Sequence, residues 1–127
     1  MKTQIEISYL TDTLINHSEQ PLYLNLKTYH IVKGKSNEFL SHPEHYITLP
    51  DRTDLNENLI FEKFLRYLDE TTENIIRNEI KLNGNKKNIP SILKKYNVLE
   101  DWEEFRKLEY KTILVNWCKN NKINFII

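Results

Sequence analysis

The sequence predicts an α+β fold, in which a short N-terminal helix and a small antiparallel sheet (a hairpin plus a third strand) are packed by a C-terminal cluster of about four helices. Three observations predict this class. Before Pro50, a short segment alternates apolar and polar residues, and after Pro50 apolar residues recur every three or four positions, the period of a helix. The chain has 127 residues, 11% of them aromatic, which is enough to build one core. We therefore predict a single domain over residues 1–127.

The first half of the chain contains the expected sheet. A helix over Ile7–Asn16 is predicted first, because its leucines fall near one helical face. Leu22, Leu24 and Leu26 then alternate with polar residues, which is typical of a half-buried strand. The three expected strands are Leu22–Leu26, Tyr29–Val32 and His45–Leu49, with a loop over Lys33–Pro43.

The second half contains the expected helices. Asp54 and Glu57 have the spacing of a capping box, as do Asp101 and Glu104. We expect the helices to begin near Asp54, at Thr72, near Pro90 and at Asp101, the second ending before Gly84 and the last near Asn121. Ile123–Ile127 is strongly β-prone and is a candidate edge strand.

The core is expected among the large apolar residues of these helices. The predicted core residues are Phe61, Phe64, Trp102, Phe105, Ile113 and Trp117. From Ile113 to Cys118 the last helix has almost no polar side, so we expect it to be buried on several sides, in the centre of the domain or in a dimer interface.

Four segments carry a resemblance to a known family. They are Tyr23-Leu24-Asn25-Leu26, Ile47 to Pro50, Trp102-Glu103-Glu104-Phe105-Arg106, and Trp117. In this order, over almost the whole chain, they resemble the uncharacterised bacterial protein family zero-one-five-eight, with Tyr29 where the turn of that family has a glycine. The resemblance implies the fold and a bacterial origin, and it brings no catalytic residues.

Charge and composition exclude several classes of function. Eighteen basic and eighteen acidic residues cancel, so no net charge steers the protein to nucleic acid or to an anionic membrane. No apolar run approaches the roughly 20 residues that span a bilayer, and we expect a cytoplasmic protein without a membrane partner. With two isolated glycines and one cysteine, the sequence offers no phosphate-binding loop and no cysteine-based zinc site, and we expect no cofactor.

Three small groups of residues could carry chemistry, and each has a plainer interpretation. His42 and His45 could bind a metal together with a carboxylate, but exposed loop histidines explain them as well. Asp51, Asp54 and Glu57 could do acid–base work, or could cap a helix. Cys118 could be a nucleophile, or an inert buried thiol. The plainer interpretation is preferred for each, so the sequence predicts no metal site and no enzyme.

Local charge is the remaining indication of function. Between positions 77 and 95 the sequence has six basic residues and one acidic residue, Glu79. The six basic residues form a candidate partner-contact surface: Arg77, Lys81, Lys86, Lys87, Lys94 and Lys95. We predict a non-enzymatic protein-binding or adaptor domain. A masking role of the immunity type belongs to this class, and a homodimer is compatible with it. The alternative is a nucleic-acid-associated protein that uses the stretch 77–95 to contact phosphates.

Overall fold

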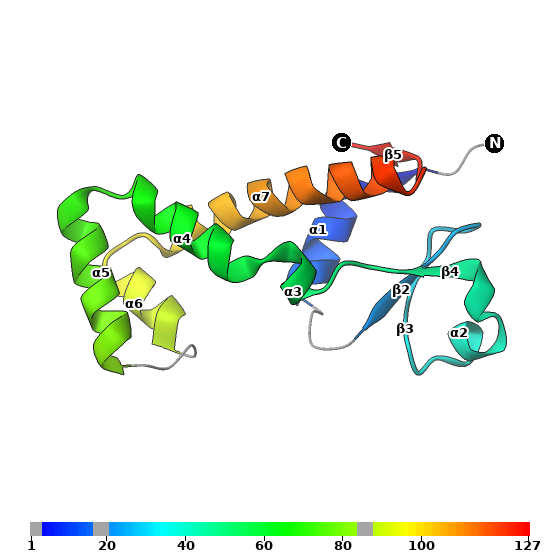
Figure 1. Ribbon diagram of the computed structural model, residues 1–127, viewed down its shortest axis with the longest axis horizontal. Coiled ribbons are helices and arrows are strands. Elements are labelled where there is room, and N and C mark those ends of the chain that lie inside the picture. Colours follow the sequence, from blue (N-terminus) through cyan, green and yellow to red (C-terminus); the bar gives the residue numbers. More distant parts are fainter. Residues whose placement is uncertain (1–3, 17–20, 84–87) are drawn as a thin grey trace. The chain divides into compact units, whose positions relative to one another are not determined.

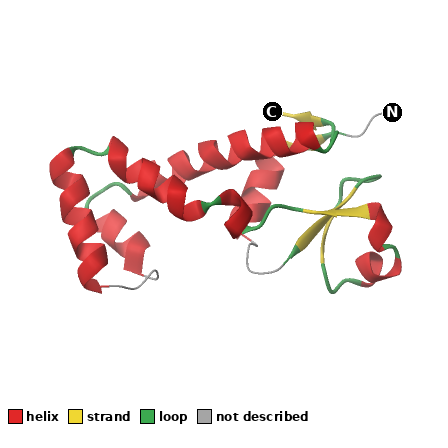
Figure 2. Ribbon diagram, in the orientation of Figure 1, coloured by secondary structure: helices red, strands yellow, loops and turns green. Residues whose placement is uncertain are grey.

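The computed structural model describes residues 4–16, 21–83 and 88–127, and it divides the chain into two compact units. The first unit is Met1–Leu55 with Tyr110–Ile127, and the second is Asn56–Glu109. Figure 1 shows the path of the chain, and Figure 2 shows its helices and strands. The long helix α7 (Leu99–Asn120) contributes its first half to the second unit and its second half to the first. The predicted α+β class is confirmed.

The first unit contains the predicted helix and sheet. Helix α1 (Ile7–Asn16) has the predicted bounds and buries Leu10 and Leu14. Strands β2 (Leu22–Asn25), β3 (Ile31–Lys33) and β4 (Tyr46–Thr48) form an antiparallel sheet in the order β3-β2-β4, with Leu24 opposite Ile31 and Ile47. The hairpin and the third strand are therefore confirmed.

Two parts of the first unit differ from the prediction. The expected loop Lys33–Pro43 contains helix α2 (Asn37–Ser41), whose first turn is capped by the Ser36 hydroxyl accepting a hydrogen bond of 3.2 Å from the Phe39 N–H. The short 3₁₀ helix η1 (Pro43–His45) follows. The expected C-terminal strand exists as β5 (Phe125–Ile126), but it pairs in parallel with β1 (Ile5–Glu6), a strand that the sequence did not predict.

The second unit is helical. It contains α4 (Glu57–Tyr67), α5 (Glu70–Asn83), α6 (Ile89–Lys95) and the first half of α7, and α5 packs against α4 and α6. Pro90 lies in the first turn of α6, as predicted. The expected role of Gly84 as a helix terminator lies outside the described residues.

Three predicted helix starts are wrong by two or three residues. The reciprocal capping pair is Asp51 with Asp54, and it opens the short helix α3 (Arg52–Leu55). Asp69 caps α5, because its carboxylate accepts hydrogen bonds from the N–H and the hydroxyl of Thr72. Helix α7 begins at Leu99, so Asp101 lies inside its first turn. A negative charge in this turn stabilises the helix by interacting with its dipole.

The predicted core is only partly buried. Phe64 and Trp102 are buried, whereas Phe61, Phe105, Ile113 and Trp117 are half-buried. On the second half of α7 the buried positions follow a spacing of four and form one stripe: Tyr110, Leu114 and Cys118. Ile113, Val115 and Trp117 beside this stripe are half-buried, so the segment is covered on more than one side, as expected, and is fully buried along one. Among the described residues, no helix is long and apolar enough to cross a bilayer.

Candidate functional site

Two of the six predicted basic contact residues are held in ion pairs inside the second unit. The Arg77 guanidinium lies 2.9 Å from Glu62 and 2.8 Å from Glu73, and Lys95 Nζ lies 2.7 Å from the Glu79 carboxylate. Hydrogen bonding to Glu62 raises the pKa of Arg77, and hydrogen bonding to Lys95 lowers the pKa of Glu79. Much of this charge is therefore neutralised by neighbours within the same unit.

The other four basic residues divide into two pairs. Lys81 and Lys94 have exposed side chains on α5 and α6. Lys86 and Lys87 lie outside the described residues. Tyr96, which the sequence placed beside this stretch, is half-buried, and its hydroxyl donates a hydrogen bond to Glu79. That tyrosine is consequently engaged with α5.

A second surface of the same unit is apolar and was not predicted. Tyr67 at the end of α4 is 78% exposed, and Leu108 on α7 is 58% exposed. The half-buried Phe105 lies one helical turn before Leu108, and its ring centroid is 5.5 Å from that of Tyr67. We call these three residues the Tyr67 patch. Periodicity within one helix could not predict this patch, because its residues come from α4 and α7, which α5 and α6 separate in the chain.

A series of aromatic ring contacts extends inward from the Tyr67 patch. Phe105 lies 5.6 Å from Phe64, Phe64 lies 5.5 Å from Trp102, and Trp102 lies 5.1 Å from Phe61 in an edge-to-face contact. Such ring pairs add stability beyond the area they bury. The exposed ring of Tyr67 is thus attached to a packed aromatic cluster.

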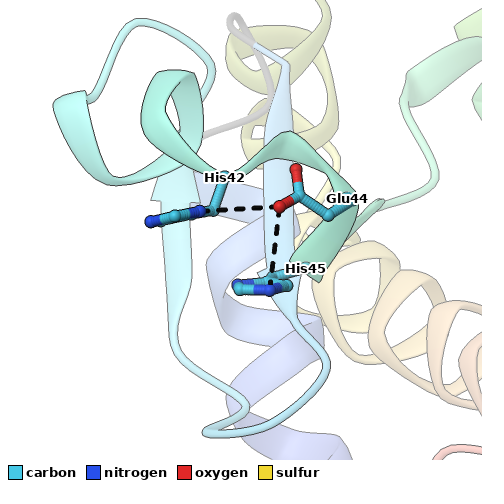
Figure 3. A group of neighbouring side chains, drawn as sticks. All are labelled: His42, Glu44 and His45. Atoms are coloured by element: carbon cyan, nitrogen blue, oxygen red, sulfur yellow. Dashed lines mark ion pairs between the residues drawn. The ribbon is translucent and has the colours of Figure 1, made fainter.

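His42 and His45, which the sequence offered as candidate metal ligands beside a plainer interpretation, come together with Glu44 in the first unit (Figure 3). His42 Nδ1 lies 3.5 Å and His45 Nε2 lies 3.8 Å from Glu44 Oε1. The two imidazole rings stack with centroids 5.1 Å apart. Hydrogen bonding to its own backbone N–H, with further contributions from the histidines, holds the pKa of Glu44 below its usual value, so its carboxylate is ionised at neutral pH.

The local fold produces this convergence. Pro43 fixes the backbone at the start of η1, and the His45 N–H donates a hydrogen bond of 3.0 Å to the His42 carbonyl. The stacked imidazole rings show that this turn brings the two histidines to the same side. The flanking Phe39 and Tyr46 rings contact each other at 5.7 Å, and Phe39 stacks on Tyr23 of β2 at 4.0 Å.

The remaining sequence candidates have structural roles. Asp51 and Asp54 are occupied in capping α3, and Glu57 lies 3.5 Å from the Arg106 guanidinium. Cys118 is fully buried, and this burial raises the pKa of its thiol to about 11. A protonated thiol is a poor nucleophile, so the geometry favours the inert interpretation of Cys118.

The first unit also contains a pocket of about 380 Å³ that was not predicted from the sequence. It is lined by β1, by Tyr9 of α1 and by the turn between β2 and β3, through Gln4, Ile5, Glu6, Thr28, Tyr29 and His30. Its walls come from separate segments that no motif links, so periodicity could not have located it.

Comparisons with known proteins add no further site. No family model, no curated protein and no solved structure matches this chain. The resemblance to family zero-one-five-eight therefore stays a prediction.

Proposed function

We propose that this chain is a non-enzymatic, cytoplasmic protein-binding domain that contacts its partner through the Tyr67 patch. The observation that carries the proposal is the 78% exposure of a tyrosine whose ring contacts the aromatic cluster beneath it. Tyrosine is enriched among the residues that dominate binding energy, because its ring contributes a large contact area and few rotatable bonds. An exposed ring that is already positioned loses little entropy on binding.

Charges of both signs lie beside the patch. Asp101 and Glu104 are exposed on α7, and each lies one helical turn before an apolar residue of the patch, Phe105 and Leu108 respectively. The nearby Lys63 is 3.6 Å from Glu109, so part of its charge is balanced locally. The exposed cations Arg66 and Lys107 adjoin Tyr67 and Leu108 in the chain, so the apolar patch itself defines the contact, and we propose a partner protein that presents an apolar pocket.

The ion pairs of Arg77 and Lys95 favour this function over nucleic-acid binding. A phosphate contact requires a cation whose charge is available, and these two cations already neutralise Glu62, Glu73 and Glu79. Among the described residues of this stretch, Lys81 and Lys94 are the exposed cations outside these ion pairs, and two lysines make a weak phosphate-binding surface. A masking role of the immunity type falls within the proposed class.

The test compares capture of proteins by the wild-type chain and by two variants, Tyr67→Ser and Leu82→Ser. Leu82 is the matched control, because it is 83% exposed on α5 and lies outside the patch. We expect a protein captured by the wild type and by Leu82→Ser, and lost with Tyr67→Ser.

Two outcomes contradict the proposal. One is capture of the same proteins by all three chains, which would remove the patch from the contact. The other is a homodimer, measured by light scattering, that Tyr67→Ser dissociates, because the occupant would then be a second copy of this chain and not a different protein.

A further inference from the structure

The three side chains of the His42–Glu44–His45 cluster present the donor atoms of a metal site. Their ligand atoms, one from each residue, all lie within 4.8 Å of one another (Figure 3). In a tetrahedral zinc site with bonds of about 2.0–2.1 Å, neighbouring ligand atoms are roughly 3.3 Å apart. The observed separations from Glu44 Oε1, 3.5 and 3.8 Å, are close to this value. Small rotations of the side chains would bring all three atoms onto one ion.

The types of donor select the ion. Two imidazole nitrogens with one carboxylate oxygen suit zinc and similar divalent transition metals, whereas calcium and magnesium prefer ligand sets made of oxygen alone. Three protein ligands leave one tetrahedral position for water. We propose that His42, Glu44 and His45 together bind one zinc ion, with a water molecule as the fourth ligand.

The backbone holds the ligands in place before the ion arrives. His42 and His45 are one 3₁₀ turn apart, and that turn is closed by the hydrogen bond between their own backbone groups. The rings stack at an interplanar angle of 15°, and one nitrogen of each lies within 4.8 Å of the other and of the Glu44 carboxylate. Phe39 and Tyr46 flank the cluster in sequence and pack onto the sheet. The backbone of the turn is therefore ordered before binding, which lowers the entropy cost of binding.

Exposure of the site gives the ion a path of entry. The side chains of His42 and Glu44 are 64% and 65% exposed, and that of His45 is 36% exposed. An exposed site with three protein ligands binds less tightly than a closed structural site with four. We therefore expect reversible binding in the micromolar range, with one zinc per chain.

The experiment uses the full chain, freed of any affinity tag, and titrates it with zinc chloride by calorimetry at pH 7.5. The variants are His42→Ala and Glu44→Gln, and the control is His30→Ala, an exposed histidine in the same unit but outside the cluster. We expect the dissociation constant to rise by about 100-fold or more for His42→Ala, because even outer-shell changes cost 10–100-fold. His30→Ala should bind as the wild type does.

A second measurement keeps the test independent of the heat signal. Cobalt(II) replaces zinc in such sites, and a tetrahedral cobalt site gives intense visible absorption, which zinc should abolish by displacement. Circular dichroism checks that each variant is folded. The proposal is overturned if the wild type binds no zinc in this range, or if folded His42→Ala and Glu44→Gln bind zinc as tightly as the wild type. Cobalt bound without the tetrahedral absorption also overturns it.

Discussion

The hydroxyl of Tyr29 accepts a hydrogen bond of 3.0 Å from the backbone N–H of Asn124, a residue 95 positions further along the chain. Tyr29 also has a φ of 60°, in the left-handed region that favours glycine. Here the backbone strain of a tyrosine is accompanied by a contact between the β2–β3 turn and the segment that leads into β5.

This contact predicts a specific cost for Tyr29→Phe. The substitution keeps the ring and the backbone conformation and removes only the acceptor, so we expect the free energy of unfolding to fall by about 0.5–1.5 kcal/mol. Urea denaturation measures the change, and amide exchange of Asn124 should accelerate in the variant. An unchanged exchange rate at Asn124 would contradict the assigned hydrogen bond.

The leucines of the predicted strand have unequal environments, and this gives a second prediction. Leu24 is fully buried, whereas Leu26 is 44% exposed because β2 ends at Asn25. We expect Leu24→Ala to cost about 2–5 kcal/mol, since it leaves a cavity in the core. Leu26→Ala, the matched control, should change stability by less than about 0.5 kcal/mol. If urea denaturation shows the same loss of unfolding free energy for both variants, Leu26 belongs to the core, and β2 does not end at Asn25.

The pair of Glu62 and Arg77 predicts a dependence of stability on pH. Hydrogen bonding from Arg77 lowers the pKa of Glu62 below its usual 4.5 in the folded state. A carboxyl group with a lowered pKa stabilises the fold above its unfolded pKa, and this contribution is lost as the pH falls through the folded value. Both side chains are partly exposed, at 45% and 34%, so solvent screening limits the contribution to under about 1 kcal/mol.

The measurement is the thermal midpoint of the wild type and of Glu62→Gln between pH 7 and pH 3. We expect the wild type to have the higher midpoint above pH 4.5, and the difference to vanish as the pH falls below that value. The exposed Glu103 on α7 provides a control in Glu103→Gln, which should track the wild type throughout. A difference that grows toward low pH would reverse the assigned sign.

The elements predicted correctly are those whose sequence signal lies within one continuous segment. The period of 3.6 located α4 and α5, and the alternation around Leu24 located β2, because each signal lies within a single element. The pairing of β1 with β5 joins Ile5 to Phe125, and two-residue strands carry too little pattern to be recognised in sequence. The short helix α2 was missed for the same reason.

The candidate sites were harder to predict than the elements. The charge run that includes Arg77 was visible in sequence, but its partner Glu62, 15 residues earlier, was not. The reverse holds for His42 and His45, whose spacing was visible while the 3₁₀ turn that orients them was not. In both cases chemistry depends on side-chain direction, which the spacing of residues does not fix outside regular helices and strands.

Capping of α3 provides the last prediction, because it separates two interpretations of one acidic segment. Asp51, Asp54 and Glu57 repeat at intervals of three, so spacing alone allows either neighbouring pair to form a capping box. In the structure the Asp54 N–H donates to Asp51 Oδ1 at 2.8 Å, and the Asp51 N–H donates to Asp54 Oδ2 at 3.0 Å.

We expect Asp51→Ala to destabilise the fold by about 1 kcal/mol in urea denaturation, since it leaves an N–H at the start of the helix without its acceptor. Asp51→Asn keeps a side-chain oxygen at the same place and should lie close to the wild type. If Asp51→Asn costs as much as Asp51→Ala, charge and not capping explains the residue; if neither variant is destabilised, the pair does not cap α3.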